Sequence, residues 1–182
     1  KLRVTMRTEI RKIQQKVGIT AIYVTHDQSE AMSISDKIII MSNGKVEQIG
    51  SSREIYYHPA SKFVADFIGE ANFLKAEVLT VSEEKARIEV AGKNFEVNNF
   101  AGAKPGSEAT LVIRPEGALL AEQGLVEGLV TLSTFMGAYQ YYQVMVGDVE
   151  IQITDYNPVN RRIYEVGEKA FLDFDPRGVY IL

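Results

Sequence analysis

From residue 72 onward the sequence breaks into short runs in which apolar and polar residues alternate. The runs are FLKAEVLTV, KARIEVAG, KNFEVNN, ATLVIRP, LVEGLVTLSTFMG, YQYYQVMV, DVEIQIT, KAFLDFD and GVYIL. Alternation with a period of two places successive side chains on opposite faces of a strand, and no long helical pattern survives in this part of the chain. Glycines occupy turn positions between the runs. The pattern predicts an all-β barrel or sandwich for residues 71–182.

The first 70 residues follow a different pattern, in which helical and strand-like segments alternate. Apolar residues recur at steps of three and four, which predicts an amphipathic helix that ends at Gly18. This stripe consists of Leu2, Met6, Ile10, Ile13 and Val17. Residues 19–25 form an apolar run rich in β-branched and aromatic side chains, which predicts a strand buried on both faces. A helix followed by a buried strand indicates an α/β segment over residues 1–70.

Capping residues mark the next helices. Asp27 is placed to cap the helix that follows it, with Glu30 three residues later as the reciprocal partner. Ser51 and Glu54 have the spacing of a capping box, and Ser61 opens a further helix. Between them lies a hairpin, residues 36–41 and 45–49, joined by Asn-Gly at 43–44. That dipeptide favours a type I′ turn because both central positions need positive φ.

Composition excludes several functions. The net charge is −4, so no positive field is available to hold a nucleic-acid backbone, and nucleic acid is not expected as a partner. The absence of cysteine excludes disulfides and thiolate metal sites. No apolar run approaches the roughly 20 residues needed to span a bilayer. Because the chain begins with Lys1 inside a helical pattern, we expect it to be part of a longer protein.

Basic residues gather at two places. On the first helix, Arg3, Arg7, Arg11 and Lys12 are interleaved with acidic residues, which favours a solvated helix face over an anion site. In the long loop of residues 155–167, an adjacent pair of arginines is compatible with an anion, a partner subunit or simple solvation. The pair is Arg161 and Arg162.

His26 stands at the end of the predicted strand, where α/β sheets hold ligands. Alternatively, it is a satisfied histidine at a strand-to-helix turn. A metal site is disfavoured because His58 is the only other histidine and no ligand spacing joins the two. A Ser-His-Asp triad is disfavoured because no G-x-S-x-G is present.

The longer string YVTHDQSEAMSISDKIIIMSNGKVEQIGSSREIYYHP resembles the segment after the catalytic strands of ATP-binding cassette (ABC) ATPases. The resemblance implies that His26 is the switch, or H-loop, histidine, which contacts the γ-phosphate of ATP. It also implies that Thr25 and Asp27 are its neighbours in the nucleotide-binding loop. An imidazole N–H donated to a phosphoryl oxygen would stabilise charge on that group.

The second part resembles the same family. HPASKFVADFIGEANFL is similar to the hinge of importer-type ABC ATPases, and Arg114-Pro115-Glu116, after Ile113, is similar to a motif of their carboxy-terminal regulatory domain. That domain is an oligonucleotide-binding-like (OB-like) β-barrel called the transport-associated OB (TOBE) domain. The resemblance implies an end portion of a P-loop type nucleotide-binding domain in residues 1–70 and a TOBE domain in residues 71–182.

The chain departs from the family where phosphate is bound. It has no G-x-x-x-x-G-K-[ST] loop, no L-S-G-G-Q signature, no Q-loop and no apolar run ending in Asp-Glu. The resemblance therefore implies a carboxy-terminal portion of the ATPase, inactive alone. ATP and Mg²⁺ would be cofactors of the full-length protein, with no cofactor or metal expected in this portion.

The resemblance also implies a setting for the full-length protein. It would pair with a second copy of the ATPase subunit and with transmembrane permease subunits at the cytoplasmic face of the cell membrane. An extracytoplasmic solute-binding protein would supply the solute. FIGEANFL is similar to polyamine and ferric-ion importer ATPases and favours spermidine/putrescine. Two alternatives stay open: a non-catalytic module that senses a solute or oxyanion, and a nucleic-acid-binding OB domain.

Overall fold

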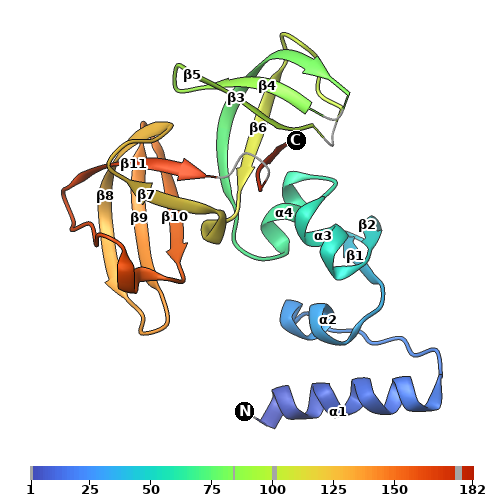
Figure 1. Cartoon of the computed structure of the whole chain (residues 1–182). Coiled ribbons are helices and arrows are strands. Elements are labelled where there is room, and N and C mark those ends of the chain that lie inside the picture. Colours follow the sequence, from blue (N-terminus) through green and yellow to red (C-terminus); the bar gives the residue numbers. More distant parts are fainter. Residues whose placement is uncertain (1, 84, 100–101, 175–177) are drawn as a thin grey trace. The chain divides into compact units, whose positions relative to one another are not determined.

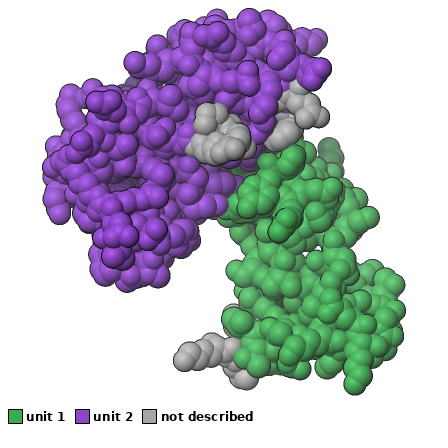
Figure 2. Space-filling model, in the orientation of Figure 1, with its two compact units in different colours: residues 1–69 green, residues 70–182 purple. Residues whose placement is uncertain are grey.

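The computed structural model describes residues 2–83, 85–99, 102–174 and 178–182, with the side chains of residues 2 and 3 left out. The chain divides into two compact units, residues 1–69 and residues 70–182 (Figure 2). The first unit is a mixture of helices and one hairpin, and the second is built from strands (Figure 1).

The first unit consists of four helices and a two-stranded antiparallel hairpin. Its elements are α1 (Leu2–Val17), α2 (Gln28–Ile34), β1 (Ile38–Ser42), β2 (Lys45–Gly50), α3 (Ser52–Tyr57) and α4 (Lys62–Phe67). Their small core consists of one face of β1 and the inner faces of α3 and α4. The buried members are Ile38, Ile40, Ile55, Val64 and Ile68.

Local signals for turns and caps are confirmed in this unit. Asn43 and Gly44 have φ of 49° and 76°, as the turn between β1 and β2 requires. Ser51 accepts from the backbone of Glu54, whose side chain accepts in return from the Ser51 N–H, so the capping box is formed. Ser61 caps α4 through the Val64 N–H.

The strand predicted at residues 19–25 is wrong for this unit. The segment has no regular secondary structure, and among the described residues no strand lies beside it to form a ladder. Ile22 and Val24 are 92% and 91% exposed, whereas a strand buried on both faces would cover them. The apolar run is typical of a strand inside a β-sheet. A strand forms only when its backbone N–H and C=O groups make hydrogen bonds with an adjacent strand.

Helix α1 is formed as the periodicity predicts, but its apolar stripe does not lie in a core. Met6, Ile10, Ile13 and Val17 are each about half exposed, and the side chain of Leu2 lies outside the described residues. Periodicity predicts which residues share a face of a helix, but not whether the unit supplies a surface to cover that face.

The second unit divides its strands between a closed barrel and a second five-stranded sheet. The barrel has the order β12-β5-β4-β3-β6 and the sheet the order β10-β9-β8-β11-β7. The elements are β3 (Asn72–Ser82), β4 (Lys85–Val90), β5 (Lys93–Asn98), β6 (Glu108–Ile113), η1 (Pro115–Gly117), β7 (Ala118–Ala121), β8 (Val126–Phe135), β9 (Gln140–Val146), β10 (Val149–Asp155), η2 (Pro158–Asn160), β11 (Lys169–Phe174) and β12 (Tyr180–Ile181). The all-β, OB-like class is confirmed, with a further sheet beyond the single barrel that was predicted.

The chain crosses twice between barrel and sheet. Strands β3 to β6 build most of the barrel, β7 to β11 build the sheet, and β12 then returns to the barrel to pair parallel to β5 and antiparallel to β6. In Figure 1 the carboxy-terminal end lies beside β6, which belongs to the middle of the sequence. The last strand therefore closes the barrel.

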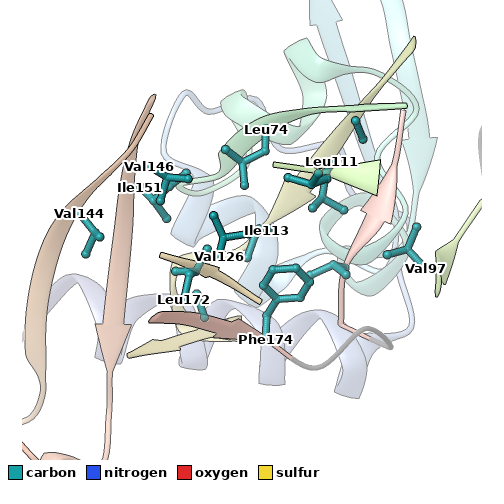
Figure 3. Close-up of a cluster of buried hydrophobic side chains, with 14 of the residues drawn as sticks. Leu74, Val97, Leu111, Ile113, Val126, Val144, Val146, Ile151, Leu172 and Phe174 are labelled. Atoms are coloured by element: carbon teal, nitrogen blue, oxygen red, sulfur yellow. The ribbon is translucent and has the colours of Figure 1, made fainter. Parts of the chain in front are cut away.

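One hydrophobic core joins the barrel to the sheet. Figure 3 shows Leu111 and Ile113 of the barrel together with Val126 and Leu172 of the sheet. Inward residues alternate with outward ones along each strand, as in the buried-half-buried alternation of β9. Removal of this apolar surface from water stabilises the unit at about 25 cal/mol per Å².

Candidate functional site

His26 lies in the loop between residues 19–25 and α2, and its side chain is exposed. Its two neighbours are fixed on either side. The Asp27 backbone N–H donates to the Thr25 hydroxyl at 3.0 Å. Asp27 caps α2, with its carboxylate accepting from the Glu30 N–H at 3.1 Å. The backbone on both sides of His26 is therefore held while its imidazole faces solvent.

Glu30 is the centre of the network that holds this loop. Its carboxylate accepts from the Thr25 hydroxyl at 2.8 Å, from the Tyr23 hydroxyl at 3.1 Å and from Arg7 at 3.1 Å. Capping by Asp27 is thus confirmed, but the predicted reciprocal role of Glu30 is corrected. Glu30 points to the strand-like segment and to α1, and the Asp27 N–H is satisfied by Thr25 instead.

Arg7 links α1 to the loop. One terminal nitrogen of its guanidinium lies 2.8 Å from the Asp27 carboxylate and 3.1 Å from that of Glu30. The side chain of Arg7 is only 15% exposed, so the interpretation as a solvated helix face is wrong at this position. Arg11 pairs with Asp36 in the same way, and Lys12 pairs with Glu9 on the helix surface.

The network shifts the pKa values of both carboxylates downward. The pKa of Asp27 is lowered first by the hydrogen bond from the Glu30 backbone and further by the charge of Arg7. The pKa of Glu30 is lowered first by the Thr25 hydroxyl, then by Tyr23 and Arg7. Both groups are therefore ionised at neutral pH, and the loop carries negative charge beside the exposed His26.

The residues that sequence reasoning missed are Arg7, Tyr23 and Glu30 as one cluster. Only the spacing of Glu30 from Asp27 gave a signal, and that spacing has a local explanation, the capping box. Tyr23 and Arg7 reach the cluster through the fold, because residues 7 and 30 lie 23 positions apart. No spacing rule within one element predicts such a contact.

The second predicted motif, Arg114-Pro115-Glu116, lies between β6 and β7 of the second unit. Arg114 is buried, at 4% exposure, and its guanidinium donates to the Glu70 carbonyl at 2.9 Å. Pro115 is buried at the first position of η1, and Glu116 is exposed. Burial raises the pKa of nearby Tyr180 to about 12, an effect that the positive charge of Arg114 partly opposes. Arg114 therefore has a structural role, because its hydrogen bond to Glu70 holds the segment that leads into β3 of the barrel.

The remaining basic pair is neutralised by carboxylates. Arg161 lies 3.6 Å from Asp155, and Arg162 lies 3.1 Å from both Glu122 and Glu168. Ion pairing therefore explains the two arginines without an anion.

The described residues offer neither a metal site nor a membrane-spanning helix. They contain no group of three or more His, Asp or Glu side chains that could hold a metal ion. They also contain no helix that is long and apolar enough to cross a membrane. The group in this loop that could bind a nucleotide is the exposed imidazole of His26, which can donate one hydrogen bond to a phosphate oxygen. The carboxylates around it are already paired with Arg7.

The sequence of the chain is similar to a known domain family and to known import proteins. Residues 111–182 match the model of the TOBE domain family. The Fe(3+) ions import ATP-binding proteins FbpC of Rhizobium etli and Brucella abortus are both 40% identical, over 185 and 184 residues, covering 100% of this chain and 51% of each relative. The spermidine/putrescine import ATP-binding protein PotA of Ruegeria pomeroyi is 41% identical over 150 residues, covering 81% of this chain and 41% of the relative.

Among solved structures, the cytoplasmic molybdate-binding protein ModG with molybdate bound matches with a TM-score of 0.47 and 15% identity. The match covers 60% of this chain and 94% of that one.

The matched family model begins in β6 and runs to β12, so it includes the second sheet and the strand that closes the barrel. Residues 111–182 are thus similar to a TOBE domain. Over its full length the chain is similar to import ATP-binding proteins, in line with the sequence resemblance. The chain spans about half the length of these relatives.

Proposed function

We propose that this chain is the carboxy-terminal part of the ATP-hydrolysing subunit of an ABC importer, in which His26 contacts the γ-phosphate of ATP. The proposal is supported by similarity to import ATP-binding proteins along the whole chain. The observation that carries it is the loop geometry. An exposed imidazole lies between two neighbours, Thr25 and Asp27, that are held by hydrogen bonds.

In this proposal His26 has one chemical task. Its imidazole donates an N–H to an oxygen of the transferring phosphoryl group, where negative charge must be stabilised. Thr25, Asp27 and Glu30 hold the backbone so that this donor is preorganised and costs little to orient on binding. ATP supplies the phosphoryl group when bound. In the full-length protein, the loop that binds the phosphates of ATP and the ligands for Mg²⁺ would lie in the part that corresponds to the half of the relatives that this chain does not span.

The importer setting is proposed on the same ground. Two copies of the subunit would bind ATP between them at the cytoplasmic face of the membrane and act on transmembrane permease subunits. An extracytoplasmic solute-binding protein would deliver the solute. We assign residues 1–70 to the nucleotide-binding domain and residues 71–182 to the regulatory domain. Arg114, Pro115 and Glu116 would belong to the latter as structural residues.

The solute is proposed to be spermidine or putrescine, on the strength of the FIGEANFL segment. The relatives named for ferric-ion import match the whole chain and the one named for spermidine/putrescine import matches 81% of it, so the two solutes must be compared directly. Cells that carry the natural operon, with and without the gene for this subunit, should differ in uptake of labelled spermidine and not of ferric iron. A difference in iron uptake alone would assign the solute to iron while leaving the ATPase proposal intact.

The ATPase proposal itself is tested by the natural gene. The coding sequence upstream of Lys1 should encode a phosphate-binding loop, a signature motif and a catalytic glutamate, and the full-length protein should bind ATP. A natural protein that starts near residue 1 and binds no nucleotide would leave the alternative, a non-catalytic sensing module.

A further inference from the structure

A pocket of about 480 Å³ lies at one end of the second sheet and is lined only by residues of the second unit. It is lined by residues from the end of β8, the start of β9 and the segment after β10. The lining residues are Ser133, Phe135, Gln140, Pro158, Val159, Ile163 and Glu165. Its volume is within the range of roughly 300–1,000 Å³ that small-molecule sites occupy.

The walls of this pocket are fixed by the fold. The β8–β9 turn is held by the Met136 N–H, which donates to the Tyr139 carbonyl at 2.9 Å, with Gly137 in positive φ. On the other wall, the buried carboxylate of Asp155 accepts from the Asn157 N–H at 2.9 Å and pairs with Arg161. A ligand would therefore meet a largely preformed surface, which lowers the entropy cost of binding.

The far end of the same wall is fixed as well. Tyr164 is buried at 3% exposure, and the Gly167 N–H donates to the Val130 carbonyl of β8 at 2.8 Å. The Glu165 N–H donates to the carboxylate of Glu168 at 2.8 Å. These contacts hold the backbone around Glu165, which is one of the residues that line the pocket.

The apolar part of the pocket is open to solvent. Val159 is 87% exposed and Phe135 is 67% exposed, with Ile163 beside them at 39%. A hydrocarbon group that covered these side chains would gain about 25 cal/mol of binding free energy for each Å² of apolar surface removed from water. The pocket therefore suits a ligand with an apolar portion.

The polar part of the pocket carries one negative charge. Gln140, at 3% exposure, donates to the Ser133 hydroxyl at 2.9 Å. The two arginines of the same loop pair with other carboxylates, Arg161 with Asp155 and Arg162 with Glu122 and Glu168. The carboxylate of Glu165 is thus available to a cation and would repel an oxyanion.

We propose that this pocket binds a primary alkylamine. The hydrocarbon chain lies against Phe135, Val159 and Ile163, and the ammonium group pairs with the carboxylate of Glu165. The assignment follows from charge complementarity and from the juxtaposition of apolar surface with a single anionic group. It does not depend on the proposed ATPase function.

The test is a titration of the 182-residue chain with hexylammonium chloride, followed by ¹H–¹⁵N NMR. Amide shifts should concentrate in residues 133–140 and 158–166. Hexanol, which has the same chain without the charge, and hexanoate, which has the opposite charge, should bind more weakly by about threefold or more, as expected for loss of a partly exposed ion pair. Equal binding of hexanol or hexanoate would overturn the proposal.

Two variants and a matched control sharpen this test. Glu165→Gln keeps the shape of the side chain and should weaken hexylammonium binding about three- to fivefold without changing hexanol binding. Val159→Ser should weaken both ligands. Glu150→Gln removes an exposed carboxylate of β10 outside the pocket and should change neither. The spectra of the free variants report whether each is folded. An unchanged affinity of folded Glu165→Gln, or an equal loss in Glu150→Gln, would contradict the proposal.

Discussion

The side chain of Asn72 pairs with the backbone of Gln152 as a neighbouring strand would. Its amide nitrogen donates to the Gln152 carbonyl at 2.7 Å, and its oxygen accepts from the Gln152 N–H at 2.7 Å. Asn72 begins β3 of the barrel, and Gln152 lies in β10, an edge strand of the second sheet. One side chain therefore satisfies an open sheet edge and ties the sheet to the barrel.

Replacement of Asn72 should destabilise the second unit. Asn72→Ala removes both bonds and leaves the N–H and C=O groups of the half-buried Gln152 without these partners, which costs about 1–3 kcal/mol. Urea unfolding followed by tyrosine fluorescence measures the loss. Asn94→Ala, at an exposed position of β5, is the control and should change stability by less than about 0.5 kcal/mol. Equal stability of the two variants would show that the Asn72 pairing contributes nothing.

Gly128 should tolerate no side chain, because β8 and β9 approach closely there. A Cβ at this position would lie 2.5 Å from the Val144 Cγ1 and 3.1 Å from the Met145 carbonyl oxygen. Gly128→Ala should cost about 1–3 kcal/mol through overpacking. Gly117→Ala is the matched control, since a Cβ there meets nothing within 4 Å. Thermal unfolding of both variants would contradict this account if Gly117→Ala lost as much stability as Gly128→Ala.

Ionisation of Tyr180 should destabilise the barrel at high pH. Its pKa in the folded state is raised to about 12, above the ordinary 10.0, chiefly by burial. A raised pKa stabilises the fold fully below pH 10, and that contribution is lost as the pH rises through 12, because the unfolded chain releases the proton first. The loss amounts to about 1–3 kcal/mol.

The matched variant for this pH dependence is Tyr180→Phe. Other tyrosines of this unit, among them Tyr142 and Tyr164, also have raised pKa values, so the wild type should lose stability from several sources. Unfolding free energies measured between pH 8 and 11.5 should therefore fall less steeply in Tyr180→Phe than in the wild type. Parallel curves would show that Tyr180 does not titrate as described.

The link between α1 and the His26 loop should weaken in acid. The pKa values of Asp27 and Glu30 are lowered from the ordinary 3.8 and 4.5. Lowered carboxyl pKa values stabilise the contact above those ordinary values, and the stabilisation is lost as the pH falls through the lowered ones. Hydrogen exchange of the α2 amides should thus accelerate below about pH 4 beyond its intrinsic pH dependence.

Arg7→Ala tests the cause of that acid sensitivity. Without the guanidinium, the exchange of the α2 amides should already be faster at pH 7 and should change less on acidification. Lys12→Ala serves as the control, because it removes a charge from the helix surface whose ion pair, among the described residues, is with Glu9. An unchanged exchange rate at pH 7 in Arg7→Ala would mean that the ion pairs do not hold the loop.

Local features of this fold were predictable, whereas pairing was not. The caps at Asp27 and Ser51 and the turn at Asn43-Gly44 depend on a few adjacent residues and are found as expected. The alternation after residue 72 identified strands but not their partners, because a period of two is the same in a barrel and in an open sheet. The return of β12 to the barrel is therefore visible only in the structure.

The site shows the same division. The position of His26 between a strand-like segment and a helix followed from the sequence, and its role stays a prediction. The ion pairs of Arg7 did not follow, since a basic residue on an amphipathic helix is usually solvated and only the fold brings the two carboxylates to it. Residues 19–25 show the reverse case. Their composition favours a strand, but composition does not supply the neighbouring strand.

The most direct test of the account is hydrolysis by the natural full-length protein carrying His26→Ala. Loss of one donor to the transferring phosphoryl group should lower ATP turnover about 100-fold or more, with ATP affinity changed less than about threefold. His58→Ala, the same substitution at the other histidine, should leave turnover within about twofold of the wild type. Turnover by His26→Ala equal to that of His58→Ala would contradict the assignment of His26 as the γ-phosphate contact.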